Sequence, residues 1–141
     1  MKDKKKIDFR FHGNDINNKV NREWILKTKS FKDLIVWQKA YRLTLEIYRI
    51  TKTFPSHETY GLTQQVRKAA ISLPSNIAEG YGRKHKAEYQ QFLSIAYASL
   101  LELETQYLLS LDLNYISKNE IIENLIKEVG SMLYRMIYPI R

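Results

Sequence analysis

From Phe31 onward, apolar residues recur every three or four positions, which is the period of amphipathic helices. The first predicted helix ends before Pro55, because a proline disfavours the α conformation in the residue before it. Its apolar residues form two adjoining stripes, Leu34, Trp37, Tyr41, Leu45 and Tyr48 on one and Val36, Ala40, Leu43, Ile47 and Ile50 on the other. So wide an apolar arc predicts that this helix contacts more than one neighbour.

A second helix is predicted to start near residues 58–62 and to contain Pro74. Its apolar face includes several small residues: Leu62, Val66, Ala69, Ala70, Leu73 and Ile77. Proline lacks the backbone N–H and clashes with the preceding turn, so we expect a kink or a break at Pro74. Ser72 and Ser75 are the predicted partners of the backbone groups that Pro74 leaves free. Two glycines suit the end of this helix, Gly80 and Gly82.

Two further helices complete the pattern. The third is predicted over residues 86–113, where Asn114 breaks it. The fourth opens with the sequence SKNE at residues 117–120, which matches a capping box with Ser117 as the N-cap, and Pro139 ends it. Four helices with short links predict an all-α fold, an antiparallel up-down-up-down four-helix bundle over residues 31–141.

The segment before the bundle, residues 1–30, has no sustained apolar period and is predicted to be a largely irregular N-terminal extension. The chain has 141 residues and a net charge of +8. Nine Lys and Arg against four Asp and Glu give the extension +5, and 14 against 11 leave +3 for the rest. A basic tail is typical of a protein that meets polyanions, although it also serves solubility.

Composition narrows the chemistry. The chain has no cysteine, which excludes disulfides and thiolate metal sites. No apolar run approaches a membrane span and no signal peptide is recognisable, so we expect a cytoplasmic protein. The three histidines, His12, His57 and His85, have no carboxylate at metal-ligand spacing, and no phosphate-cradling loop or catalytic triad is present. We therefore expect neither an enzyme, nor a cofactor, nor a metal site.

Glu104 interrupts the apolar stripe of the third helix, between Leu100 and Tyr107. A buried carboxylate needs a charged partner or several hydrogen-bond donors. Arg67 or Lys68, on the preceding antiparallel helix, is the predicted partner. We expect a buried or interfacial ion pair that fixes register, with a catalytic acid as the lesser alternative.

Polar residues form a second stripe around Pro74: Lys68, Ser72, Ser75, Asn76, Glu79 and Arg83. Such a stripe is either a solvated face or a contact with a ligand or subunit. A basic cluster follows directly, and the candidate nucleic-acid-binding residues are Arg67, Lys68, Arg83, Lys84 and Lys86, with Lys4, Lys5 and Lys6 in the extension. Tyr81 and Tyr89 are candidates for stacking on unpaired bases.

Three stretches carry a family resemblance: FKDLIVWQKAYRL, then YGLTQQVRKAAISLPSNIAEGYGR, then EYQQFLSIAYASLLELETQ. In order and spacing they resemble the four-helix-bundle family of 23S rRNA-intervening-sequence proteins over about residues 31–138. The signature residues are Ser72, Pro74, Ser75, Asn76, Glu79, Gly80 and Glu104. The chain departs from the pattern at His85 and Lys86, where the family often has a Ser or Asp helix cap followed by acidic residues.

The resemblance implies an up-down bundle that assembles into homo-oligomeric rings, expected to be pentamers. Family members are often encoded within insertions in large-subunit rRNA genes, a context that suggests nucleic-acid binding. The family is also similar to the accessory proteins of diversity-generating retroelements, which bind a reverse transcriptase and its RNA. Two hypotheses follow: a homo-oligomeric module that binds nucleic acid, most simply structured RNA, or a protein-interaction scaffold for a partner such as a reverse transcriptase.

Overall fold

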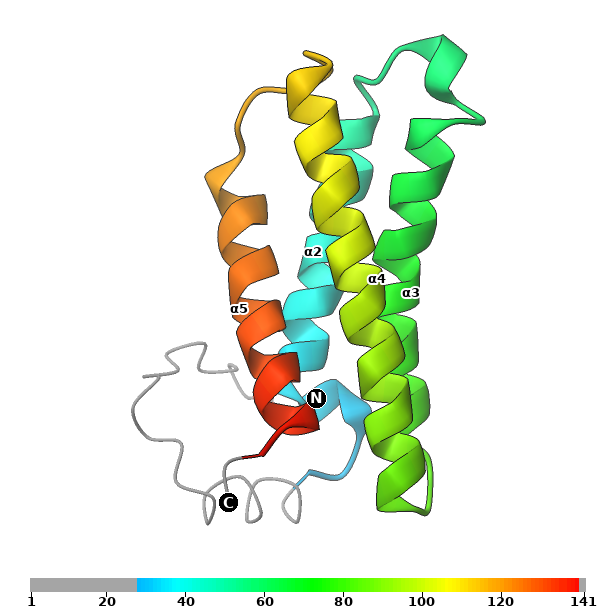
Figure 1. The fold of residues 1–141 in the computed structure, drawn as a ribbon, viewed down its shortest axis with the longest axis vertical. Helices are drawn as coiled ribbons and strands as arrows, with labels where there is room; N and C mark the ends of the chain where they lie inside the picture. The colour runs from blue at the N-terminus through cyan, green and yellow to red at the C-terminus, as the bar shows by residue number, and fades with distance from the viewer. Residues whose placement is uncertain (1–27, 140–141) are drawn as a thin grey trace, which may run out of the picture.

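A computed structural model describes residues 28–139, and these form helices joined by short links (Figure 1). The elements are η1 (Phe31–Asp33), α2 (Ile35–Thr51), η2 (Ser56–Glu58), α3 (Leu62–Tyr81), α4 (Lys86–Asp112) and α5 (Glu120–Ile137). The predicted all-α class is confirmed. Within the described range, no helix combines the length and apolarity needed to cross a bilayer.

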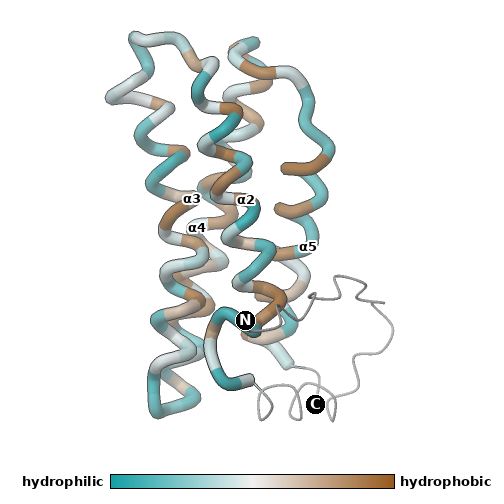
Figure 2. The backbone as a smooth tube through the Cα atoms, turned by 180° about the vertical axis from the view of Figure 1, so that it is seen from behind, coloured by the Kyte–Doolittle hydropathy of each residue, from teal (hydrophilic) through white to brown (hydrophobic). Residues whose placement is uncertain are grey.

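The four long helices form an antiparallel up-down-up-down bundle, as predicted (Figure 1). Each packs against the helices before and after it, and α5 closes the bundle by returning to α2. Helices α2 and α4 are diagonal and share no interface. Along each helix apolar residues alternate with polar ones (Figure 2). The apolar ones meet in one core, whose fully buried members include Leu43, Ile47, Leu73, Ile77, Leu93, Leu100, Leu103, Ile122 and Leu133.

Helix α3 runs without a break through Pro74, so the predicted break is wrong. Pro74 has no N–H to donate to the carbonyl oxygen of Ala70, one turn back. The hydroxyl of Thr44, on α2, donates to that oxygen at 2.7 Å instead. The predicted serine partners do not have this role, since Ser75 is exposed and the hydroxyl of Ser72 lies 2.8 Å from that of Ser99 on α4.

Helix α3 packs most extensively against α4, and small residues allow this close approach. Helix α3 ends where its two glycines predict, with Gly80 in the last turn and Gly82 as the C-cap, and Gly80 also faces α4. A β-carbon at Gly80 would lie 2.7 Å from the β-carbon of Phe92, closer than real contacts allow. Glycine is therefore required at position 80 by packing rather than by backbone conformation.

The two ends of the α4–α5 connection are fixed by asparagines. Asn114 has a φ of 60° and ends α4, as predicted for this residue. The predicted cap of α5 is wrong, because α5 starts at Glu120 and its N-cap is Asn119, not Ser117. The Asn119 side chain accepts a hydrogen bond from the Ile122 N–H at 3.0 Å, while the Asn119 N–H donates to the Tyr107 hydroxyl at 2.9 Å.

Candidate nucleic-acid interface

The basic turn, residues 83–86, joins α3 to α4 and consists of Arg83, Lys84, His85 and Lys86. All four side chains are exposed. The turn lies at the end of the bundle where the described chain begins (Figure 1). The predicted basic cluster is therefore accessible at one end of the molecule.

The cations of the basic turn differ in whether other side chains contact them. The Arg83 guanidinium lies 3.2 Å from the Glu79 carboxylate and 4.7 Å from the centre of the Phe92 ring. These contacts orient Arg83 and offset part of its charge. Neither Lys84 nor Lys86 forms an ion pair with any residue in the described range. Their ammonium groups are available to phosphates as mobile point charges.

Backbone donors add to the basic turn. His85 is the N-cap of α4, but its side chain makes no capping hydrogen bond. His85 stands where the family often has a Ser or Asp cap, and the expected side-chain cap is absent here. The first N–H groups of a helix have no partner within the helix and favour anions. At the start of α4 they can donate hydrogen bonds to phosphate oxygens beside Lys84 and Lys86. Glu88, in the first turn of α4, opposes part of this attraction.

The basic extension joins the bundle close to the basic turn. The Tyr81 hydroxyl donates to the Thr28 carbonyl oxygen at 3.1 Å and lies 3.0 Å from the Thr28 hydroxyl. Tyr81 comes two residues before Arg83, so the junction and the turn are neighbours. Lys29 and Lys32 add two exposed cations at this end, and sequence reasoning counted them only in the net charge of their segments. Lys4, Lys5 and Lys6 lie outside the described residues.

The two tyrosines proposed for base stacking pack against each other under the basic turn. Their ring centres are 6.5 Å apart in an edge-to-face arrangement, and both rings are partly buried. The Tyr89 hydroxyl is buried and has no hydrogen-bond partner in the described part of the chain. Burial, and to a lesser degree the neighbouring Tyr81, raises the pKa of Tyr89 to about 12. These contacts favour a structural role for Tyr81 and Tyr89 over stacking on bases.

Arg67 and Lys68 do not join the basic turn. They precede Arg83 by sixteen and fifteen residues on α3, which separates them from it by about 24 Å along the helix. Arg67 donates from Nε to the Thr51 hydroxyl at 2.8 Å, and its guanidinium lies 4.7 Å from the centre of the Tyr48 ring. Arg67 is thus held against α2, and Lys68 is an isolated exposed cation.

The polar stripe around Pro74 divides into two sets. Ser72 and Asn76 are half-buried, and the Asn76 amide donates to the Ser72 carbonyl oxygen at 2.8 Å and to its hydroxyl at 2.9 Å. With the Ser72–Ser99 contact, these bonds belong to the α3–α4 interface. Ser75 and Glu79 remain exposed. The solvated-face interpretation is therefore correct for part of the stripe only.

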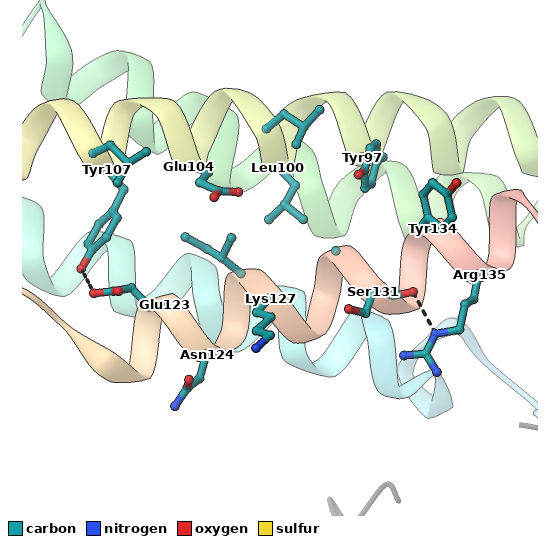
Figure 3. Close-up of a pocket in the computed structure, with 14 residues that line it drawn as sticks. Tyr97, Leu100, Glu104, Tyr107, Glu123, Asn124, Lys127, Ser131, Tyr134 and Arg135 are labelled. Carbon is teal, nitrogen blue, oxygen red and sulfur yellow. Dashed lines mark hydrogen bonds between the residues drawn. The ribbon is translucent and has the colours of Figure 1, made fainter. Parts of the chain in front are cut away.

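A groove of about 760 Å³ lies along the interface between α4 and α5 (Figure 3). Its lining combines apolar, aromatic and charged side chains, among them Tyr97, Leu101, Glu104, Lys127, Tyr134 and Arg135. The Glu104 side chain lies in the space between the two helices, whereas the Lys127 and Arg135 side chains point away from that space (Figure 3). Glu104 is exposed and has no ion pair with any described residue, so the predicted buried pair with Arg67 or Lys68 is wrong within the single chain.

A known protein family matches the region of the chain that forms the bundle. A family model described as 23S rRNA-intervening sequence protein matches residues 32–135. The chain belongs to this family. The match begins in η1 and ends in α5, so the family region is the helical bundle, and the whole basic extension, residues 1–30, lies outside it. A search of curated proteins finds no match. Across residues 28–139, no cluster of three His, Asp or Glu side chains is arranged to hold a metal ion.

Proposed function

We propose that this family member is a non-enzymatic, homo-oligomeric bundle that binds structured RNA through its basic end, expected to act as a cytoplasmic pentamer. One observation carries this proposal: the basic turn and the junction with the basic extension lie at the same end of the bundle, joined by the Thr28–Tyr81 hydrogen bonds. Lys84 and Lys86 supply unpaired charge there, and the α4 N-terminus supplies backbone donors.

Assembly would turn this modest site into a strong one. A single chain carries +8, so five copies carry about +40. Each phosphate neutralised releases counterions, and affinity then falls steeply as salt rises. Support for assembly comes from apolar side chains about half exposed on α2, α3 and α4, which in a single chain face solvent: Tyr41, Leu45, Ile71, Ile95, Leu101, Leu108 and Leu109.

The test is a gel shift against the transcript surrounding the gene, over a salt series, with multi-angle light scattering on the same sample. We expect an oligomer whose RNA complex weakens steeply between 50 and 300 mM salt, about 10⁴-fold if six phosphates are contacted. The chain lacking residues 1–27 should bind more weakly with a shallower salt dependence. Binding that ignores salt, or no binding at low salt, would contradict the proposal.

The open α4–α5 groove supports a second candidate function, a scaffold that holds a protein partner such as a reverse transcriptase. The groove offers apolar and charged side chains together, as non-obligate protein interfaces do. Gene neighbours distinguish the two candidates: an rRNA insertion around the gene favours RNA binding. An adjacent reverse-transcriptase gene with a repeat template favours the scaffold.

A further inference from the structure

Helix α4 carries its apolar residues on every side, although only part of its surface meets α3 and α5. Side chains on its outer side remain about half exposed, among them Ile95, Leu101 and Leu109. Residues 87–112 include four carboxylates and neither Lys nor Arg. We define the acidic stripe as Leu101, Glu102, Leu109 and Asp112, which are all exposed. A helix that is apolar all round is normally covered on all sides, whereas nothing among residues 28–139 covers the acidic stripe.

Helix α2 presents the complementary surface. We define the basic stripe as Tyr41, Arg42, Leu45 and Lys52, which are all exposed. Neither Arg42 nor Lys52 has an ion pair within the described residues. Arg49, also exposed, lies beside this stripe and pairs with Glu46 at 2.8 Å. The outer side of α2 is thus basic with apolar residues between its charges, whereas that of α4 is acidic with apolar residues between its charges.

The two stripes have the same spacing. Arg42 and Lys52 are ten residues apart, and so are Glu102 and Asp112, about 15 Å in each helix. An apolar residue precedes the first charge in both, Tyr41 before Arg42 and Leu101 before Glu102. Two such helices laid side by side in the same direction can pair both charges, and Tyr41 with Leu101, in one register. Leu45 then lies opposite Thr105, and Leu109 lies opposite the aliphatic part of Arg49.

The height of the stripes in the bundle permits that register. Thr44 bonds to Ala70 on α3, and Ser72, two residues further along α3, contacts Ser99 on α4. Position 44 on α2 is therefore level with about position 101 on α4. When two copies stand level, each acid of the acidic stripe lies roughly 5 Å further along the bundle axis than its matching cation, in the direction in which α2 and α4 run. Long Arg and Lys side chains can reach that far. Copies standing side by side, with no shift along the bundle axis, bring both charge pairs together.

We propose that the basic stripe of one copy packs against the acidic stripe of the next. This inference rests on the homo-oligomer of the proposed function and assigns its interface. Because α2 and α4 are diagonal in the bundle, the two stripes lie on opposite sides of the molecule. Contact between them is heterologous; it closes into a ring where each copy is rotated relative to the last about a common axis, and otherwise runs on as an open filament. The basic turn of every copy then lies at the same end of the ring.

Charge reversal tests the interface. Arg42→Glu with Lys52→Glu, or Glu102→Lys with Asp112→Lys, should each weaken assembly at least about 100-fold, because like charges then face each other. The chain carrying all four substitutions should regain the wild-type mass in light scattering, since its stripes are complementary again. Lys118→Glu with Lys127→Glu is the matched control, on α5 and its leading loop, and should leave the mass unchanged. Circular dichroism verifies that each variant is folded.

The outcomes separate this inference from the proposed function. If the wild type is oligomeric and both reversed pairs keep its mass, or if the fourfold variant stays dissociated, the assigned interface is wrong while the homo-oligomer stands. If the wild type is itself a monomer at about 0.1 mM, both are wrong. RNA binding is measured separately, so a monomer that still binds RNA would leave only the electrostatic part of the proposed function intact.

Discussion

Helix α4 meets its two neighbours in opposite ways. Against α3 the interface is closed: Gly80 lets the helices approach, and the hydroxyls of Ser72 and Ser99 lie 2.8 Å apart. Against α5 the helices are in contact, but a groove of about 760 Å³ lies along their interface, and Gly130 is in its lining. Gly80 faces the β-carbon of Phe92, an atom fixed to the α4 backbone, so its lack of a side chain sets the distance between the helices. Gly130, in contrast, faces the flexible end of Leu100, and Glu104 puts an exposed carboxylate in the groove lining.

The largest test of this contrast compares the same substitution on both sides of α4. Gly80→Ala places a β-carbon 2.7 Å from that of Phe92, and neither backbone can move cheaply, so we expect a loss of about 2–3 kcal/mol in the free energy of unfolding. Gly130→Ala meets only Leu100 Cδ2 at 3.3 Å, while the helix gains up to about 1 kcal/mol of propensity. Urea unfolding of both variants measures the difference. Equal effects would show that the two interfaces are equally tight.

The second prediction concerns the interface between α3 and α2. Thr44→Val leaves the Ala70 carbonyl oxygen without its donor, and we expect a cost of about 2 kcal/mol. In a Pro74→Ala background the restored N–H bonds to that oxygen, so the same substitution should cost less than about 1 kcal/mol. A double-mutant cycle by urea unfolding gives the coupling. Additive effects would mean that Thr44 does not compensate for the proline.

The third prediction uses pH to probe the closed interface under the basic turn. An unfolded tyrosine loses its proton near pH 10, whereas folded Tyr89 holds it to about pH 12. The folded state binds more protons in that window, so stability falls as pH rises from 10 to 12, by roughly 2 kcal/mol. Tyr89→Phe removes the part of this slope that comes from Tyr89 and, by deleting a buried hydroxyl that has no partner among residues 28–139, leaves stability at pH 7 equal or higher. Identical pH profiles for the two chains would refute this account.

The smallest effect is expected in the groove. Glu104→Leu changes an exposed side chain with no ion pair in the described range, so stability should shift by no more than about 0.5 kcal/mol. Thermal unfolding of the monomeric charge-reversed chain is the right measurement, because it excludes any contribution from a neighbouring copy. A loss of several kcal/mol in the free energy of unfolding would contradict this and would support the buried ion pair that the sequence pattern predicted.

Sequence periodicity predicted the helices well because each buries one face in a single core. It failed where the answer depends on a partner far along the chain. Pro74 shows from the sequence that one backbone N–H is missing. The hydroxyl that donates in its place belongs to Thr44, which lies on another helix. Glu104 lies on the side of α4 that faces α5, and only the packing shows that α5 leaves a groove there. Both Ser117 and Asn119 are good N-caps, and Tyr107, by binding the Asn119 N–H, helps to select between them.

The candidate site divides in the same way. Arg83, Lys84 and Lys86 follow one another, so the sequence alone places them together. Arg67 and Lys68 are grouped with them only by charge, and the helix between them sets the ends about 24 Å apart. The proximity of the Lys29 segment depends on Thr28 reaching Tyr81, across 53 positions of sequence, which no local pattern reveals.

The most direct test of the RNA-binding claim is fluorescence anisotropy with one labelled structured RNA from 50 to 300 mM salt. The comparison is between the wild-type chain, the Lys84→Glu and Lys86→Glu double variant, and the Lys118→Glu and Lys127→Glu double variant as a control of equal net charge. We expect the Lys84→Glu and Lys86→Glu variant to bind at least about 10-fold more weakly than both others, with a shallower dependence of log affinity on log salt. Equal affinities and equal slopes for all three chains would contradict RNA binding at the basic end.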